Sequence, residues 1–226
     1  MLSELLHLIY PVLCPACNSP LYRNEKTICF RCKNHLPRTR FHLQPGNALE
    51  QMFWGRVPFR AAAACFIFRK EGGVQHLLHE LKYRNAPEIG REIGRMYGRE
   101  LANSNAFSEP EIIIPVPLHP NKYRVRGYNQ SAVFGEGLEE SLPGRLATSV
   151  LIRSTNTSTQ TRKSRFARWE NVESTFAIEN QESIQNKHIL LIDDVITTGA
   201  TLEACAVNLF QAGARDISVA CIATPL

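Results

Sequence analysis

The stretch ILLIDDVITTGAT, residues 189–201, joins a run of branched apolar residues, two adjacent acids and a loop rich in threonine and glycine. The apolar run predicts a buried strand that delivers Asp193 and Asp194 to its carboxyl end. Directly afterwards, residues 200–212 carry apolar side chains at helical spacing and predict a helix. A buried strand, a short loop and an amphipathic helix in this order are typical of an α/β protein.

The loop between the predicted strand and helix has the chemistry of a phosphate site. Unpaired backbone N–H groups and the helix dipole favour an anion at a helix N-terminus. Two carboxylates would not bind that anion, but they can accept hydrogen bonds from sugar hydroxyls or hold a divalent cation. We therefore expect a ligand that carries a phosphate, a diol and a metal-bound pyrophosphate. The residues expected to bind it are Asp193, Asp194, Val195, Thr197, Thr198, Gly199, Ala200 and Thr201.

This segment resembles the signature of type I phosphoribosyltransferases that binds phosphoribosyl pyrophosphate (PRPP). In that family the two acids contact the ribose hydroxyls and the threonine–glycine loop holds the 5′-phosphate. The resemblance implies that PRPP binds together with Mg²⁺, and that Asp193 and Asp194 are catalytic if PRPP is turned over. The alternative is a strand-to-helix turn that is acidic by chance.

The surrounding sequence predicts a parallel sheet flanked by helices. Strand-like and helix-like segments alternate from about residue 61 onward, and the strands are continuously apolar, as in sheets covered on both faces. Ligands of such sheets bind beyond the carboxyl ends of the strands. We expect a type I phosphoribosyltransferase-like domain at residues 61–226, preceded by a connector at residues 41–60. Its predicted strands are 61–68, 112–114, 188–192 and 216–223, and its further helices lie around 74–81, 89–101 and 129–142.

Four of the seven cysteines form two Cys-x-x-Cys pairs. This spacing predicts a tetrahedral Zn²⁺ site with a structural role, because so short a segment needs a metal to fold. Residues 1–40 are therefore expected to form a short helix followed by a zinc ribbon. Unligated cysteines are the alternative. The predicted ligands are Cys14, Cys17, Cys29 and Cys32.

Two basic segments are candidates for binding anions. Lys122, Arg124 and Arg126 follow the predicted strand at residues 112–114, and could hold a pyrophosphate or a nucleic-acid backbone, or simply be solvated. Residues 157–171 mix cations with Phe166 and Trp169, a composition that suits single-stranded DNA but also a helix packed on the core. The cations of this second segment are Arg162, Lys163, Arg165 and Arg168.

The order of motifs along nearly the whole chain is similar to that of the ComF family, the ComFC and GntX group. The motifs are the four-cysteine ribbon, Leu81-Lys82-Tyr83, Pro115-Val116-Pro117, Arg124-x-Arg126-Gly127-Tyr128-Asn129-Gln130, Gln160-Thr161, Arg168-x-x-Asn171-Val172 and the acidic loop. The resemblance implies a bacterial protein associated with DNA uptake in natural competence, acting with other DNA-uptake proteins. By analogy with the family, Lys82 and Arg124 are candidates for binding the pyrophosphate.

Composition restricts the setting. The chain has 226 residues, a formal net charge of +5, and no run approaching the roughly 20 apolar residues of a membrane helix. Metal-type spacing and cysteines in apolar runs favour a reducing, cytoplasmic location. Three hypotheses remain open: a phosphoribosyltransferase with an unknown acceptor, a protein that binds single-stranded DNA and uses the loop without turnover, and a structural adaptor.

Overall fold

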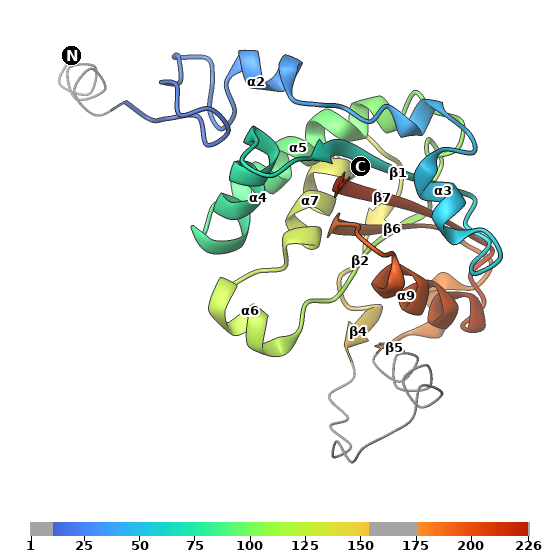
Figure 1. Ribbon diagram of the computed structural model, residues 1–226. Helices are drawn as coiled ribbons and strands as arrows, with labels where there is room; N and C mark the ends of the chain where they lie inside the picture. Colours follow the sequence, from blue (N-terminus) through green and yellow to red (C-terminus); the bar gives the residue numbers. More distant parts are fainter. Residues whose placement is uncertain (1–10, 154–175, 226) are drawn as a thin grey trace, which may run out of the picture.

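A five-stranded parallel sheet lies at the centre of the computed structural model, which describes residues 11–153 and 176–225 (Figure 1). The strand order is β1-β7-β6-β2-β3, and every neighbouring pair in this sheet is parallel. The strands are β1 (Ala61–Phe68), β2 (Ile112–Pro115), β3 (Arg145–Leu146), β6 (His188–Val195) and β7 (Asp216–Pro225). The fold class expected from the sequence is therefore confirmed.

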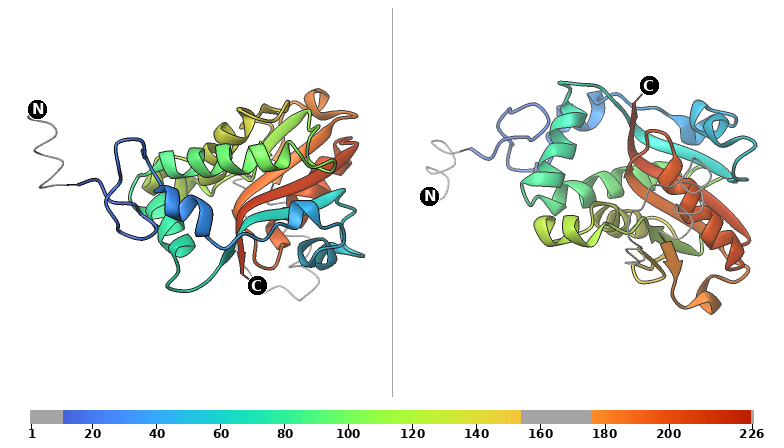
Figure 2. Two further views of the ribbon diagram at one scale, coloured as in Figure 1. Left: turned by 90° about the horizontal axis from the view of Figure 1, so that it is seen from above. Right: turned by 60° about the horizontal axis from the view of Figure 1, so that its bottom comes forward.

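Helices cover both faces of the sheet, as the two further views show (Figure 2). One apolar core lies between the sheet and α4 (Gly73–Tyr83), α5 (Pro87–Leu101) and α7 (Gln130–Glu139). The second core lies on the other face, against α3 (Ala48–Phe53) and α9 (Ala200–Gln211). Burial on both faces explains why the strands are continuously apolar rather than alternating.

Glycines bring α5 and α7 into backbone contact. A Cβ added at Gly94 would lie 2.2 Å from the carbonyl oxygen of Phe134, and one added at Gly137 would lie 2.1 Å from that of Arg91. Glycine lowers helix propensity, and Gly137 weakens the sequence argument for α7 for that reason. In the structure it is the absence of a side chain at Gly94 and Gly137 that lets the two helices meet.

The shorter elements complete the fold. The expected connector, residues 41–60, contains the 3-10 helix η1 (Phe41–Leu43) and α3, and both Leu49 and Phe53 are buried in the core. It is thus part of the packed structure rather than a simple link. An antiparallel pair of strands, β4 (Leu151–Arg153) with β5 (Phe176–Ile178), was not expected from the sequence. The remaining elements are α2 (Phe30–His35), α6 (Pro120–Arg126) and η2 (Gln181–Ile184).

Two expectations fall on residues outside the described ranges. The helix predicted at the start of the chain lies within residues 1–10, and the basic segment with Arg162, Lys163, Arg165 and Arg168 lies within residues 154–175. Among residues 11–153 and 176–225, no helix is both long enough and apolar enough to span a bilayer.

Candidate functional site

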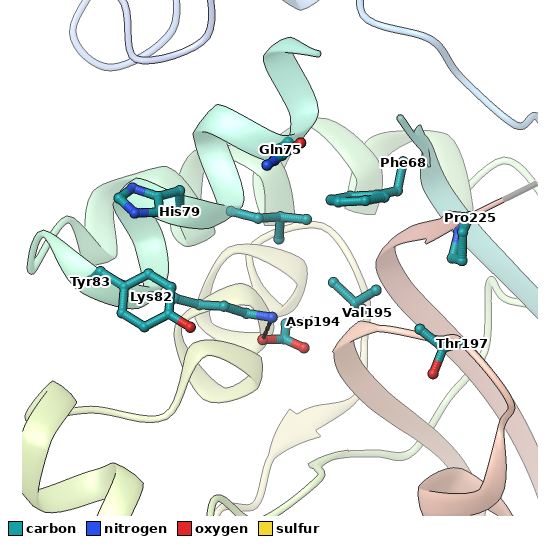
Figure 3. A pocket seen from close by; sticks show the side chains of 10 residues that line it. Phe68, Gln75, His79, Lys82, Tyr83, Asp194, Val195, Thr197 and Pro225 are labelled. Atoms are coloured by element: carbon teal, nitrogen blue, oxygen red, sulfur yellow. Dashed lines mark ion pairs between the residues drawn. The ribbon is translucent and has the colours of Figure 1, made fainter. Parts of the chain in front are cut away.

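The two adjacent acids stand near the carboxyl end of β6 and have different partners. The Asp193 Oδ1 atom accepts hydrogen bonds from the Ser131 hydroxyl, at 2.9 Å, and from the backbone N–H of Asp194, at 2.8 Å. The carboxylate of Asp194 forms an ion pair with Lys82, with 2.9 Å between Nζ and Oδ2 (Figure 3). Three elements, α4, α7 and β6, therefore meet at the acidic pair.

Burial and mutual repulsion distinguish the two carboxyl groups. Burial, followed by the charge of Asp194, raises the pKa of Asp193 to about 7. The hydrogen bonds from the Asp194 amide and from Ser131, and the charge of Lys82, oppose this rise. Near neutral pH Asp193 can therefore gain or lose a proton, whereas the neighbouring carboxylate of Asp194 is paired with Lys82.

The threonine–glycine loop encloses a small cavity at the N-terminus of α9. Gly199 caps the helix in the left-handed region, with φ of 76°, and a Cβ there would lie 2.5 Å from the ring of Phe53. The cavity has a volume of about 40 Å³, enough for one small group, at the positive end of the helix dipole. The residues lining it are Asp193, Val195, Ile196, Thr197, Thr198, Gly199, Ala200, Thr201 and Leu202.

A second, larger cavity adjoins Asp194 (Figure 3). It measures about 480 Å³, within the range of small-molecule sites. One helix, α4, supplies half of its lining, and the ends of β1 and β7 supply apolar walls. The residues lining it are Phe68, Gln75, Leu78, His79, Lys82, Tyr83, Asp194, Val195, Thr197 and Pro225. Asp193 thus lines a space of phosphate size, and Asp194 lines a space that could hold a larger group.

The predicted cationic residues of the described ranges lie in three different settings. Lys82 reaches the acidic pair, whereas Lys122 and Arg124 are exposed on α6 and do not line the cavity beside Asp194. Arg126 is engaged within the protein: its guanidinium lies 5.5 Å from the ring centre of Tyr83 and donates a hydrogen bond to Gln130.

Residues 126–131 link the site to its surroundings. The Tyr128 hydroxyl donates to the carbonyl of Leu81, the neighbour of Lys82. The Asn129 side chain donates to the carbonyl of Val116 and caps α7. Ser131, which the sequence analysis missed, lies two residues after Asn129, and its hydroxyl donates a hydrogen bond to Asp193. Its position after a helix-capping asparagine, beyond a strand's carboxyl end, is the signal that could have identified it.

The four predicted metal ligands lie together. All four cysteine sulfurs are within 4.8 Å of one another, and the Sγ atoms of Cys17 and Cys29 are 3.7 Å apart. Tetrahedral Zn²⁺ with bonds of about 2.3 Å needs sulfurs about 3.8 Å apart. The backbone N–H of Cys29 points at the sulfur of Cys14, at 3.4 Å, as suits a thiolate. The cluster therefore has the ligands and spacing to bind a metal such as zinc.

The cysteine segment packs against the helical side of the domain. Gly73, at the start of α4, has little room for a side chain, because a Cβ would lie 3.1 Å from the carbonyl oxygen of Ala16. Lys33 forms an ion pair with Glu92 of α5, and Arg38 forms one with Glu100 at 2.8 Å. These two cations near the cysteines are therefore used in contacts within the protein.

Comparison with known proteins identifies the kind of domain that contains the site. The family described as "Phosphoribosyl transferase domain" matches residues 130–225, which include Ser131, both acids and the loop. Among solved structures, the glutamine PRPP amidotransferase from B. subtilis has 19% identity and a TM-score of 0.44, over 63% of this chain and 30% of that one. The parallel sheet and the family match, rather than this similarity, establish the fold.

Three relatives are similar over much of the chain. The DNA utilization protein YhgH of Escherichia coli is 30% identical, over 95% of this chain and 91% of its own length. Competence protein F of Haemophilus influenzae is 27% identical over the same shares of the two chains. Competence protein ComFC of Streptococcus pneumoniae is 35% identical over 49% of this chain and 46% of its own. With the cysteine cluster and the phosphoribosyltransferase domain in one chain, these similarities show that the protein belongs to the ComF family.

Proposed function

We propose that the chain binds PRPP together with Mg²⁺ at the acidic pair and the loop that follows it. The observation that carries the proposal is that Asp193 lines the cavity at the α9 N-terminus and its neighbour Asp194 lines the larger cavity beside α4. The 5′-phosphate would occupy the small cavity, where helix N–H groups favour an anion. The acids would then accept hydrogen bonds from the ribose hydroxyls.

The larger cavity offers space for the groups on the other side of the ribose. Lys82, held at 2.9 Å from Asp194, is placed to bind the pyrophosphate when the ligand enters. Bound Mg²⁺ would neutralise charge on that pyrophosphate. The protein itself would orient the ribose and exclude water with the apolar walls formed by Phe68, Leu78 and Val195.

Transfer of the phosphoribosyl group to an acceptor is the activity that this site would support. The fixed carboxylates would stabilise positive charge that develops at the ribose as the pyrophosphate departs. The similarity to competence proteins suggests that the reaction, or the binding alone, serves DNA uptake.

Calorimetric titration with Mg-PRPP tests the binding step. The wild type should bind, and Asp193→Asn/Asp194→Asn should lose binding. The matched control is Asp216→Asn, at the amino end of β7, which should bind as the wild type does. Equal affinity in the double variant would contradict the proposed site. Release of pyrophosphate in the presence of a panel of acceptors then tests turnover. Binding of PRPP without release of pyrophosphate would indicate a binding protein and not a transferase.

A second candidate function is the binding of single-stranded DNA without turnover. The observation that favours it is α6, a short helix on which Lys122 and Arg124 are exposed beside Tyr123, whose ring could stack on a base. Anisotropy with labelled single strands distinguishes the two candidates. Salt-sensitive binding that is lost in Lys122→Ala/Arg124→Ala, but kept in Asp193→Asn/Asp194→Asn, would place the DNA on α6 rather than at the acids.

A further inference from the structure

Arg56 approaches the phosphate loop from residues that precede the sheet. Its guanidinium forms an ion pair with Glu203, and its Nη1 atom lies 3.5 Å from the carbonyl oxygen of Thr198. The side chain extends past the ring of Phe53, whose centre lies 5.9 Å from the guanidinium carbon. Phe53 in turn contacts Gly199, so the segment that carries Arg56 is seated against the loop.

Glu203 presents an electrostatic difficulty that Arg56 removes. It lies in the first turn of α9, and its side chain is only 14% exposed. A carboxylate there stabilises the free helix through the dipole, but it would repel a phosphate bound at the same helix end. The guanidinium of Arg56, 36% exposed, neutralises this carboxylate. The anion site then keeps the helix dipole without a competing negative charge.

The contact with Thr198 has a second effect, on the direction of the loop amides. The C=O and N–H groups of a trans peptide point in opposite directions. Because the Thr198 carbonyl faces Arg56, the N–H of Gly199 in the same peptide faces away from it. Both residues line the small cavity. Arg56 therefore favours an orientation of this peptide in which the Gly199 N–H is not turned toward the arginine and is available to a phosphate in the cavity.

We propose that Arg56 is a positioning residue of the phosphate loop, which neutralises Glu203 and orients the Thr198 peptide so that the loop accepts a doubly charged phosphate monoester. The inference rests on the proposed function, because it concerns the phosphate end of the same site. It adds a residue that lies outside the loop and outside residues 130–225, the part matched by the phosphoribosyltransferase family.

The experiment compares two ligands that occupy opposite ends of the site. Ribose 5-phosphate probes the small cavity, and Mg-pyrophosphate probes the end near Lys82. Arg56→Ala should weaken binding of ribose 5-phosphate about tenfold, equivalent to about 1.4 kcal/mol, and leave Mg-pyrophosphate within twofold of the wild type. Arg56→Lys keeps the charge and should stay within about threefold of the wild type for both ligands.

A double variant isolates the role of Glu203. If neutralisation is the mechanism, Arg56→Ala/Glu203→Gln should recover most of the affinity that Arg56→Ala loses. The matched control is Arg95→Ala, which removes another exposed arginine–glutamate pair, with Glu140, on the opposite face of the sheet. It should leave both affinities unchanged.

The outcomes separate the inference from the proposed function. Wild-type chain that binds neither Mg-PRPP nor ribose 5-phosphate overturns both. Wild-type binding that is unchanged in Arg56→Ala overturns the inference alone. Equal losses for both ligands in Arg56→Ala also overturn it, because they indicate general damage to the fold. A double variant as weak as Arg56→Ala refutes the neutralisation of Glu203 as the mechanism. If Arg56→Ala does not fold, Glu203→Gln must bind ribose 5-phosphate at least as tightly as the wild type, and weaker binding refutes the mechanism.

Discussion

Replacing Asp193 by asparagine should stabilise the free protein while it abolishes ligand binding. The wild-type carboxyl has a pKa of about 7 in the folded chain, against an ordinary value of 3.8. As the pH rises from 4 to 7, the unfolded chain gains free energy by ionising this group, and the folded chain does not. Stability is therefore lost across this window and stays low above it. Asparagine removes the loss and retains an oxygen for Ser131 and for the Asp194 amide.

The size of the effect follows from the shift. A rise in the pKa from 3.8 to about 7, at about 1.36 kcal/mol per pKa unit, lowers the free energy of unfolding above pH 7 by at most about 4 kcal/mol. Asp193 is half-buried, so solvent screening reduces this to about 2 kcal/mol. For a chain of this length that corresponds to a rise in Tm of about 4–8 °C at pH 8.5.

Thermal unfolding from pH 5.5 to 8.5 is the assay. The difference in Tm between Asp193→Asn and the wild type should be smallest at pH 5.5 and grow towards pH 7. The control is Asp216→Asn, whose carboxylate in the wild type is paired with Arg215 at 3.1 Å and gains nothing from neutralisation. A variant less stable than the wild type at pH 8.5, or a difference independent of pH, would refute the electrostatic reasoning.

Three further changes test other parts of the structure. Gly94→Ala should lower the free energy of unfolding by about 2 kcal/mol or more, because the new methyl group cannot be accommodated 2.2 Å from the Phe134 carbonyl oxygen. Denaturant unfolding measures this loss, and an unchanged free energy would show that α5 and α7 separate easily. Tyr128→Phe should cost about 1 kcal/mol and weaken Mg-PRPP binding, because it frees the Leu81 carbonyl beside Lys82; a loss of stability with unchanged affinity would show that this bond does not position the lysine. Cys32→Ser should reduce bound zinc well below one per chain, whereas Cys205→Ala, a buried cysteine outside the cluster, should leave the metal content intact; equal zinc in both would exclude the four-sulfur site.

The sequence predicted the elements whose pattern is long and strongly apolar. The strands at residues 61–68 and 188–192 and the helix after Gly199 all occur, because burial on both faces of a parallel sheet leaves an unbroken apolar run. β3 spans only two residues, Arg145–Leu146, which is too short for any periodicity. α6 was not expected as a helix, although Pro120 at its first turn and Gly127 at its end are ordinary helix boundaries.

The site was only partly visible in the sequence. Asp193, Asp194 and the threonine–glycine loop are adjacent along the chain, so their chemistry can be read together. Arg56 carried no such signal, since its partners Thr198 and Glu203 are 142 and 147 residues away. Ser131 is likewise brought to Asp193 only by the packing of α7 on the sheet, across 62 residues. Residues that support the loop from a distance therefore required the three-dimensional structure.

The contact between Gly94 and Gly137 has a consequence for how this site can vary among related sequences. Most helix pairs are spaced by side chains, so their separation can change by small steps as one residue replaces another. The backbones of α5 and α7 are in direct contact here, so the two helices cannot move closer together. Ser131 lies in the first turn of α7, so we expect the distance from the Ser131 hydroxyl to Asp193 to depend on this fixed spacing. We therefore expect related sequences to keep glycine at positions 94 and 137, and to differ more in the residues that line the cavity beside Asp194.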